Sequence, residues 1–359
     1  MTIYETELNR WAADDALPWE LLEGQRILLS GASGMIGKCI IDILMKHNTT
    51  TENPVRILAL SRNENTARQR FASYWDDPCF SYRSCDVNDA LPDYGDADYI
   101  IHAASNTHPL QYAGDPVGTI TANVLGTKNL LEYGASHGAR RFCFCSSVEV
   151  YGENRGDVEK FDESYLGYID CNTLRAGYPE GKRLGEALCN AYRQAHSLPF
   201  TIARLSRVYG PTMLAGDSKA IAQFIKKAAG EENIVLKSEG NQKFSYTFVT
   251  DAAAGVLYTL LLGQDGEAYN VADEGSDITL KELAGYLAEI AGTKVVFELP
   301  EEHERRGYSQ ATKAMLDAGK LKKLGWKADV SMAEGLSCAV CAAKKLRIDN
   351  ETVQKKAYG

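Results

Sequence analysis

The sequence predicts an α/β protein with a Rossmann-like, doubly wound parallel sheet and a smaller C-terminal substrate-binding lobe. From Arg26 onward, short apolar runs alternate with amphipathic segments, which is the pattern of β-α-β units. A glycine-rich turn follows the first apolar run. The chain has 359 residues, 45% of them hydrophobic and 24% charged. That composition indicates a globular chain with a large core and an appended lobe.

The apolar runs predict the strands of the sheet. They lie at residues 26–30, 55–60, 81–85, 99–102, 141–146 and 200–204. Between them, residues 35–44, 120–136 and 182–195 carry apolar side chains at helical spacing. In the last of these helices, four residues share one face that we expect to lie against the sheet: Leu184, Leu188, Ala191 and Ala195.

The regular alternation of apolar runs and amphipathic segments ends after Pro211. Residues 220–229 and 280–291 read as helices, and the strands near them, at 234–237 and 294–297, are short and outside β-α-β register. We therefore divide the chain into a helical extension (1–25), a Rossmann domain (26–211) and a mainly substrate-binding lobe (212–359), with residues 244–275 partly returning to the Rossmann domain.

Charge and targeting signals exclude several classes of partner. The formal net charge is −9 with no basic run, so we expect neither a nucleic-acid nor a membrane partner. The longest apolar stretch, 252–262, is too short to span a bilayer, and the N-terminus lacks the features of a signal peptide, so we expect a cytoplasmic protein. Cys338 and Cys341 have the spacing of half a zinc site, but no second pair or nearby His completes it, and we expect no metal.

A phosphate-binding loop is predicted directly after the first strand. Gly31, Gly34 and Gly37 lie between that strand and the following apolar helix. Glycines at this spacing allow a tight turn and a close approach of the backbone to a pyrophosphate, which meets the helix N-terminus. The strand-loop-helix context predicts dinucleotide binding.

The end of the second strand bears on the choice of dinucleotide. A carboxylate there grips the ribose 2′-hydroxyl of NAD, but this chain has Ser61, Arg62 and Asn63. Arg62 can pair with a 2′-phosphate, which favours NADP, while an Arg with no ligand role leaves NAD open. Asp86 and Val87, just past the third strand, are placed to meet the adenine ring.

A proton relay is predicted from Tyr178 and Lys182. Their spacing of four residues puts a phenol and an ammonium on one face of a helix. We expect the nearby Lys⁺ to lower the pKa of the Tyr178 phenol, which is otherwise a poor base at neutral pH. Gly185, a turn further along, leaves room for a cofactor or a backbone segment. Alone, such a pair is also common on protein surfaces.

Polar residues at the carboxyl end of the fifth strand strengthen that prediction, because open α/β sheets bind ligands there. Ser147 can polarise a substrate oxygen, and Glu149 can move a second proton. The two residues face the same side in an extended chain. A solvated carboxylate at a strand end is the alternative for Glu149.

Six motifs in order resemble the extended short-chain dehydrogenases/reductases, the family of sugar-nucleotide epimerases and dehydratases. The resemblance runs from about Arg26 to Leu336 and is strongest for UDP-glucuronate decarboxylases, although 4,6-dehydratases share the Glu. The motifs are Gly31-x-x-Gly34-x-x-Gly37, His102-Ala-Ala-Ser105, Asn123-x-x-x-Thr127, Ser146-Ser-Val-Glu-Val-Tyr-Gly152, Tyr178-x-x-x-Lys182 and Val208-Tyr-Gly-Pro211.

The resemblance implies an enzyme that oxidises C4 of a nucleoside-diphosphate sugar, remodels the 4-keto intermediate and returns the hydride, so that NAD(P) is recycled. It makes Tyr178 the base, assisted by Lys182, Ser147 and Glu149, and relatives commonly pair as homodimers. It assigns the cofactor to Gly31, Ser33, Gly34, Met35, Ile36, Gly37, Ser61, Arg62, Asn63, Asp86, Val87, Ala103, Ala104, Ser105, Asn123, Tyr178, Lys182 and Val208. It assigns the substrate to Asn106, Arg175, Arg207, Lys243 and Arg305.

Some residues depart from the family pattern. Phe244 stands where relatives place an Arg that contacts the diphosphate or the uronate, and Arg207 stands where many have Asn. Our hypothesis is that Arg207 supplies the lost charge from the opposite wall. Arg305 holds the place of a second phosphate-contacting Arg in an altered context. Pro179 implies that Tyr178 begins its helix, where proline is tolerated.

Several functions remain open at this point. Decarboxylation and 4,6-dehydration both fit Glu149. A 4-epimerase needs no such carboxylate, and a net NADPH-dependent reductase of a keto sugar would suit Arg62. A non-catalytic dinucleotide-sensing protein shares the fold, since fold alone never fixes function. The retained Tyr178 and Lys182 favour an enzyme.

Overall fold

A seven-stranded parallel sheet forms the centre of the computed structural model, which describes residues 1–107, 114–298 and 312–358. The strand order is β10-β6-β5-β4-β1-β2-β3. The apolar residues of the inner strands are buried on both faces, as a parallel sheet covered by helices requires, while the edge strand β3 is partly exposed. The predicted fold class is confirmed. The strands are β1 (Arg26–Ser30), β2 (Arg56–Ser61), β3 (Phe80–Ser84), β4 (Tyr99–His102), β5 (Arg141–Ser147), β6 (Phe200–Leu205) and β10 (Ala268–Val271).

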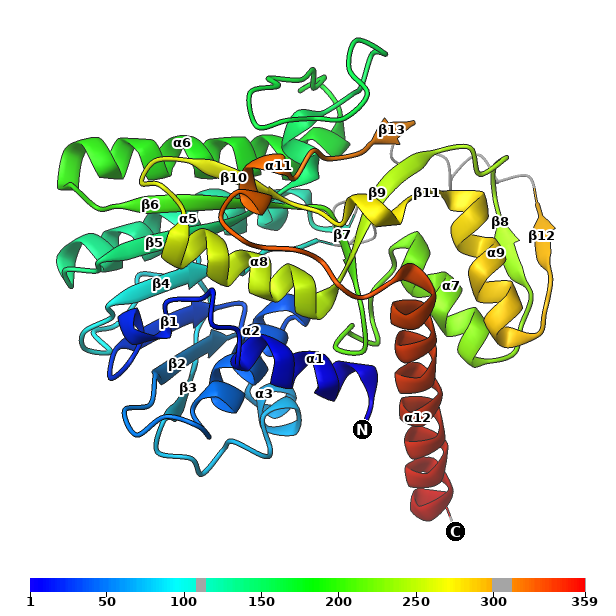
Figure 1. The fold of residues 1–359 in the computed structure, drawn as a ribbon, viewed down its shortest axis with the longest axis horizontal. Coiled ribbons are helices and arrows are strands. Elements are labelled where there is room, and N and C mark those ends of the chain that lie inside the picture. The colour runs from blue at the N-terminus through cyan, green and yellow to red at the C-terminus, as the bar shows by residue number, and fades with distance from the viewer. Residues whose placement is uncertain (108–113, 299–311, 359) are drawn as a thin grey trace.

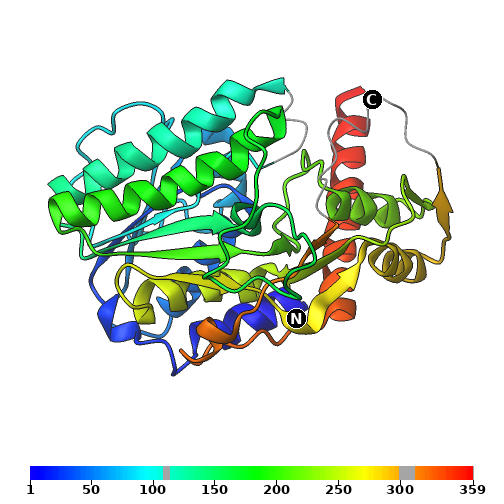
Figure 2. The same ribbon diagram turned by 90° about the horizontal axis from the view of Figure 1, so that it is seen from above.

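Helices cover both faces of this sheet (Figures 1 and 2). The long helices α5 (Pro116–Ser136) and α6 (Gly177–His196) lie side by side on one face. On the other face, α8 (Val249–Leu262) packs against α2 (Met35–His47), and α1 (Ile3–Ala12) lies across both. The short helix α3 (Glu64–Arg70) follows β2 and contacts β3.

The predicted inner face of α6 is wrong for three of its four residues, and only Leu188 packs against the core. Leu184 is 47% exposed, and Ala191 and Ala195 are exposed as well. The buried face carries Lys182, Gly185 and Cys189 instead. A Cβ at Gly185 would lie 2.5 Å from the ring of Phe144, so this glycine makes room for that strand residue and not for a cofactor. The side of α6 that faces the sheet therefore carries a lysine and small residues, and apolar spacing alone does not identify this side.

The order of the strands creates a switch point between β1 and β4. After β3 the chain crosses β1 and β2 to form β4, and Ser30 then pairs in register with His102. The connections that leave β1 and β4 run to opposite faces of the sheet, and in such sheets ligands bind at this point, outside the carboxyl ends of the strands. The buried Ser30 hydroxyl lies 2.7 Å from His102 Nδ1 at the switch point.

The smaller lobe lies beyond those carboxyl ends, at the right of Figure 1. β7 (Arg207–Tyr209) pairs with β9 (Lys243–Phe248), which also pairs with β11 (Asp277–Thr279) and β13 (Lys313–Ala314). The short strands β8 (Ile234–Leu236) and β12 (Val295–Phe297) form a separate parallel pair. The helices of this lobe are α7 (Ala220–Ala229), α9 (Leu280–Ala291) and α12 (Met332–Tyr358), whereas the short helix α11 (Gly319–Lys322) packs on β10 and α8 of the large sheet. Short 3₁₀ helices are η1 (Trp19–Leu21), η2 (Val148–Tyr151), η3 (Leu174–Ala176) and η4 (Glu274–Ser276).

Asp251, in the first turn of α8, ties distant parts of the chain together. Its fully buried carboxylate accepts hydrogen bonds of 3.2 Å from Arg10 and Trp11 of α1 and from the backbone N–H groups of Asp329 and Val330. Burial raises the pKa of Asp251 to about 7. The N-terminal helix and the segment that enters α12 are therefore held by one acidic side chain.

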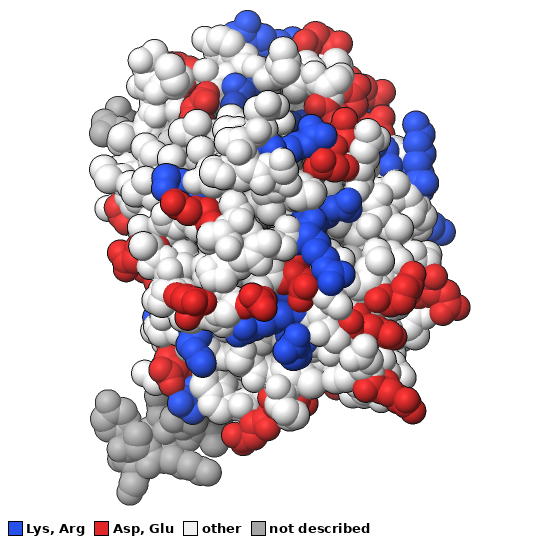
Figure 3. Space-filling model, turned by 90° about the vertical axis from the view of Figure 1, so that its left-hand side faces the viewer, with Lys and Arg blue, Asp and Glu red and all other residues white. Residues whose placement is uncertain are grey.

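The surface carries both signs of charge. On the face that Figure 3 shows, Lys and Arg side chains are interspersed with Asp and Glu, without a large field of one sign. No helix within the described ranges combines the length and apolarity that crossing a bilayer requires. Nor does any group of three or more His, Cys, Asp or Glu in those ranges have the arrangement of a metal site. Cys338 and Cys341 are free thiols near the start of α12.

Candidate active site

The glycine loop joins β1 to α2 at the switch point. Gly31 has φ +71°, a left-handed conformation that favours glycine. A Cβ there would lie 2.6 Å from the backbone of Ala103, and a Cβ at Gly37 would lie 2.4 Å from the Gly31 oxygen. The N-cap of α2 is Gly34, which brings no side chain to the first N–H groups of the helix. Those donors and the tight backbone suit a dinucleotide pyrophosphate.

The end of β2 places Ser61, Arg62 and Asn63 beside that loop. Ser61 is buried, and Asn63 caps α3 by accepting from Thr66 N–H at 2.9 Å. Arg62 is exposed, and its Nη2 lies 3.5 Å from Asn106 Oδ1. The one predicted 2′-phosphate ligand is therefore an exposed side chain just past the carboxyl end of β2, and none of these three residues is a carboxylate.

The loop after β4 is held by hydrogen bonds to α5. Ser105 donates to Asn123 Oδ1 at 2.8 Å, and the buried Asn123 amide donates to Thr119 O at 2.8 Å. Asn123 therefore anchors this loop to α5. Val87 follows β3 and Ala103 and Ala104 follow β4, so all three lie past the carboxyl ends of their strands, although β1 and β2 lie between those two strands. The Asp86 carboxylate accepts from the Asn88 N–H at 3.0 Å.

Tyr178 begins its helix as Pro179 implied, since α6 starts at Gly177 and proline lies in the first turn. Its side chain is buried near Ser147 at the end of β5. Burial raises the pKa of Tyr178 to about 12, and a hydrogen bond with Ser147 acts in the opposite direction. The prediction that Lys182 lowers this pKa is therefore wrong: desolvation exceeds the effect of the neighbouring groups.

Lys182 lies one turn further along α6 and is 2% exposed. Its Nζ donates to the carbonyl oxygen of Cys145 at 2.8 Å and lies 4.7 Å from the centre of the Phe144 ring and 6.0 Å from that of Tyr178. Burial lowers the pKa of Lys182 to about 8. The ammonium is thus fixed by the backbone of the strand that ends in Ser147.

Glu149 does not continue the strand. It lies in η2, where its N–H donates to Ser147 Oγ at 3.3 Å, so the expected extended arrangement of these two residues is wrong. The backbone turns here because Ser147 caps the 3₁₀ helix. Arg175 Nη2 donates to both carboxylate oxygens of Glu149, at 2.9 and 3.0 Å. Ser147, Glu149, Arg175 and Tyr178 are thereby gathered at one end of β5.

Sequence reasoning missed the network beneath this group. Ser146 donates to Glu186 Oε1 at 2.6 Å, and Arg204 at the end of β6 pairs with both oxygens of Glu186. These residues lie on β5, α6 and β6, so only the pairing of the two strands brings them together. The Arg-Glu pair fixes α6, and with it Tyr178, against the sheet.

The predicted substrate residues lie on several elements. Arg207 begins β7, and its guanidinium carbon lies 3.7 Å from the centre of the Phe244 ring on β9. The expectation that Arg207 lies on the wall opposite position 244 is therefore wrong, because the two residues are in contact on paired strands. Val208 is buried in β7, and Lys243 begins β9 opposite Thr279 and Lys313. Arg305 lies outside the described residues.

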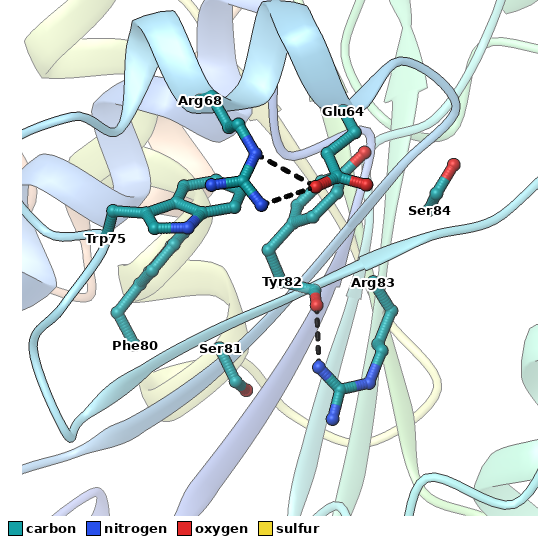
Figure 4. A pocket seen from close by; sticks show the side chains of 8 residues that line it. All are labelled: Glu64, Arg68, Trp75, Phe80, Ser81, Tyr82, Arg83 and Ser84. Atoms are coloured by element: carbon teal, nitrogen blue, oxygen red, sulfur yellow. Dashed lines mark hydrogen bonds and ion pairs between the residues drawn. The ribbon is translucent and has the colours of Figure 1, made fainter.

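The cavity drawn in Figure 4 lies elsewhere. It has a volume of about 490 Å³ and is bounded by α3 and the edge strand β3. Arg68 pairs with Glu64 on one wall and lies over the Trp75 ring. None of the predicted site residues lines this cavity, so it is separate from the group of residues around Tyr178.

The doubly wound sheet, the glycine loop at its switch point and the buried Tyr178-Lys182 pair define a dinucleotide-binding α/β protein. The model of the NAD dependent epimerase/dehydratase family matches residues 27–272. The chain belongs to this family, as its motifs predicted.

Curated relatives align over most of the chain. UDP-glucuronic acid decarboxylase 5 of Arabidopsis thaliana is 31% identical over 315 residues, covering 87% of each protein. UDP-glucuronic acid decarboxylase 3 of the same plant is 32% identical over 317 residues, covering 87% of this chain and 86% of the relative.

Solved structures share the fold. A dTDP-glucose 4,6-dehydratase from Streptomyces venezuelae with NAD bound has a TM-score of 0.77 and 24% identity, covering 90% of this chain and 98% of that one. A UDP-glucuronic acid 4-epimerase from Bacillus cereus, in complex with UDP-glucuronic acid and NAD, has a TM-score of 0.74 and 21% identity, covering 90% and 100%.

Proposed function

We propose that this chain decarboxylates a nucleoside-diphosphate uronic acid through a 4-keto intermediate, with UDP-glucuronate as the leading substrate. The observation that carries the proposal is the group of Ser147, Tyr178, Glu149 and Arg175 at the carboxyl end of β5. The relatives at 31–32% identity, which are named UDP-glucuronic acid decarboxylases, support the substrate class.

In this proposal, Tyr178 accepts the proton of the 4-hydroxyl while Ser147 donates a hydrogen bond to the same oxygen. The glycine loop and Lys182 would hold NAD(P), which would supply the hydride acceptor. The resulting 4-ketone is a β-keto acid, so the C5–C6 bond breaks with release of CO₂ and the electron pair remains as an enolate. A proton added to C5 neutralises the enolate, and return of the hydride to C4, with the proton held by Tyr178 returned to the 4-oxygen, leaves the dinucleotide oxidised as before.

Decarboxylation fits the state of Glu149 better than dehydration does. Dehydration needs a base for the C5 proton and an acid for the departing hydroxyl. Glu149 is paired with Arg175, and the preceding residue, Val148, is buried and apolar and cannot protonate the departing hydroxyl. Arg175 can also contact the carboxylate of a uronic acid, since a guanidinium binds two carboxylates through separate N–H groups.

The test is a panel of UDP-glucuronate, UDP-glucose and dTDP-glucose with product masses as the readout. The proposal expects carbon dioxide to be lost from UDP-glucuronate alone. Loss of water from dTDP-glucose would establish dehydration instead, and an unchanged mass with an altered sugar configuration would establish epimerisation. Stoichiometric consumption of NADPH would favour the reductase.

Arg207 is the proposed anchor for the substrate diphosphate. It stacks on Phe244, its Nε is buried, and no hydrogen-bond partner of that Nε is found among the described residues. A stacked guanidinium keeps its edge N–H groups available for phosphate oxygens. Arg207→Ala should raise KM about tenfold or more while Arg207→Lys retains part of the affinity. An unchanged KM in Arg207→Ala would remove this residue from the site.

The dinucleotide is proposed to be NADP in preference to NAD. The support is the exposed Arg62 beside Ser61, in a place that lacks a ribose-binding carboxylate. Arg62→Ala should weaken NADP⁺ binding about tenfold and leave NAD⁺ binding unchanged. Arg68→Ala is the control, because Arg68 pairs with Glu64 on the same helix. Equal affinity of the wild-type protein for both dinucleotides would contradict the preference.

A second copy of this chain is the proposed partner of α5 and α6. Val117, Ile120 and Leu125 of α5 and Leu184 of α6 are large apolar side chains that are between 43% and 69% exposed. Burial of such a face against its own copy would form a four-helix contact. Light scattering should give a dimer mass, and the double variant Leu125→Glu with Leu184→Glu should give a monomer. A wild-type monomer at micromolar concentration would refute the dimer.

A further inference from the structure

Arg70, the last residue of α3, joins the glycine loop to the segment that enters the smaller lobe. Its Nη2 donates to the carbonyl oxygen of Thr212 at 2.7 Å and to that of Gly34 at 3.4 Å. Thr212 in turn donates from Oγ1 to the carbonyl oxygen of Met35 at 2.9 Å. Arg70, Thr212 and the residues at the start of α2 are therefore all joined to one another by hydrogen bonds.

The surroundings of Arg70 argue against a purely electrostatic role in stability. No carboxylate lies within ion-pair distance of it in the described part of the chain, and its Nε is buried without a hydrogen-bond partner there. Burial lowers the pKa of this guanidinium. The charge of Asp42 offsets part of this desolvation cost, but the hydrogen bonds of Arg70 go to the backbone carbonyls of Gly34 and Thr212, so its main structural effect is to hold those two carbonyls together.

The segment beyond Thr212 leads directly to α7. The backbone carbonyl of Asp217 accepts from Gln223 Nε2 and Lys226 Nζ, both at 2.8 Å. One end of residues 212–217 is thus held on the N-terminus of α2, and the other end is held on the first helix of the smaller lobe. Arg207, the proposed diphosphate anchor, lies on the strand that precedes this segment.

We infer that Arg70 is a positioning residue that couples dinucleotide binding at the glycine loop to the ordering of residues 212–217 and α7. Arg70 donates to the carbonyls of Gly34 and Thr212, and the Thr212 hydroxyl donates to the carbonyl of Met35. A ligand that orders Gly34 and Met35 therefore also orders the contacts that hold Thr212. The smaller lobe is then better ordered for substrate once the dinucleotide is in place, which is coupling between two sites through one set of contacts.

The test is amide hydrogen exchange with NADP⁺ or NAD⁺ as the only added ligand. In the wild-type protein, saturating dinucleotide should slow exchange in residues 31–37 and also, by about five- to tenfold, in residues 212–217 and the first turn of α7. In Arg70→Met the slowing at residues 31–37 should persist while the slowing at 212–217 falls below about twofold. Thr212→Val, which keeps the side-chain volume, should give an intermediate value.

Arg68→Met is the matched control, because it removes an Arg from the same helix that pairs only with Glu64 and stacks on Trp75. Its exchange pattern should equal that of the wild type. The inference is overturned if the wild-type slowing stays within residues 31–37, or if the folded Thr212→Val and Arg70→Met proteins both retain the full slowing at 212–217. The readout requires no turnover, so failure of the proposed decarboxylation leaves it interpretable.

Discussion

The ammonium of Lys182 donates a 2.8 Å hydrogen bond to the carbonyl oxygen of Cys145 in a fully buried site. Burial lowers the pKa of Lys182 from 10.5 to about 8. Below pH 8 the folded and unfolded chains both carry this charge, and the folded chain bears the full desolvation cost. Between about pH 8 and 10.5 the unfolded chain binds the extra proton, so stability gains with rising pH.

Lys182→Met should therefore stabilise the protein at pH 7 by on the order of 2 kcal/mol while abolishing turnover, since ~1.4 kcal/mol accompanies each pKa unit and about 1 kcal/mol is lost with the hydrogen bond. Urea unfolding at pH 7 and pH 10 measures it, and the difference between the two proteins should shrink at the higher pH. A variant less stable than the wild type at pH 7 would contradict the burial cost.

Tyr178→Phe should abolish turnover and leave dinucleotide affinity within about threefold, because the ring keeps its packing and only the phenolic oxygen is lost. Burial raises the pKa of Tyr178 to about 12, so the phenolate fraction grows about tenfold per pH unit below that value. The first turnover, followed by rapid quench, should accelerate from pH 6 to pH 8. Residual turnover in Tyr178→Phe above about one hundredth of the wild-type rate would assign the base elsewhere.

Glu149→Gln separates the candidate reactions. It breaks the charge pair with Arg175 and should lower kcat for decarboxylation by about a hundredfold, because Arg175, the proposed contact of the uronate, loses the carboxylate that orients it. A 4-epimerase would keep its rate. The measurement is product formation from UDP-glucuronate and UDP-glucose, with circular dichroism to establish that both proteins fold. An unchanged rate of decarboxylation would show that Glu149 has no catalytic role.

Gly37→Ala should lower both stability and dinucleotide affinity. A Cβ there meets the Gly31 oxygen at 2.4 Å and the Ala32 Cα at 2.9 Å, both backbone atoms that cannot rotate away. We expect a loss of about 2 kcal/mol or more in unfolding free energy. The control is Gly285→Ala in α9, where nothing lies within 4 Å of the added carbon. That change should stabilise by roughly 0.5–1 kcal/mol. Equal effects of the two substitutions would refute the close approach.

Asp251→Asn should flatten the pH dependence of stability. The pKa of Asp251 is raised from 3.8 to about 7 by burial. When a carboxyl has a higher pKa in the folded chain than in the unfolded chain, its contribution to the free energy of unfolding is complete below the unfolded-state pKa. That contribution is lost as the pH rises through the folded-state pKa. The wild-type unfolding free energy should thus fall from pH 4 to pH 7, by ~3 kcal/mol from this group. Thermal unfolding across this range checks the slope, which should be unchanged in the variant if Asp251 does not titrate there.

The strands and the family could be predicted because their signals are local. β1 and β4 match their predicted bounds, and β2 and β3 differ by one residue at each end. A strand buried on both faces reads as an apolar run, and the glycine loop reads as a fixed spacing. The Tyr178-Lys182 pair is similarly a spacing within one helix.

What sequence reasoning could not supply depends on contacts between distant elements. The inner face of α6 is set by Phe144, which needs the glycine at 185 and displaces Leu184 outward. The Glu186-Arg204 pair and the contact of Arg207 with Phe244 exist only once strands are paired. The raised pKa of Tyr178 follows from burial, which no spacing reports.

The seventh strand of the sheet, β10, pairs with β6 although β7 to β9 and two helices intervene in the chain. During synthesis, one edge of β6 consequently remains uncovered until residue 271 has left the ribosome. An exposed strand edge invites pairing with other nascent chains. A chain arrested within the smaller lobe should therefore require a chaperone to stay in solution, whereas release after β10 removes that need.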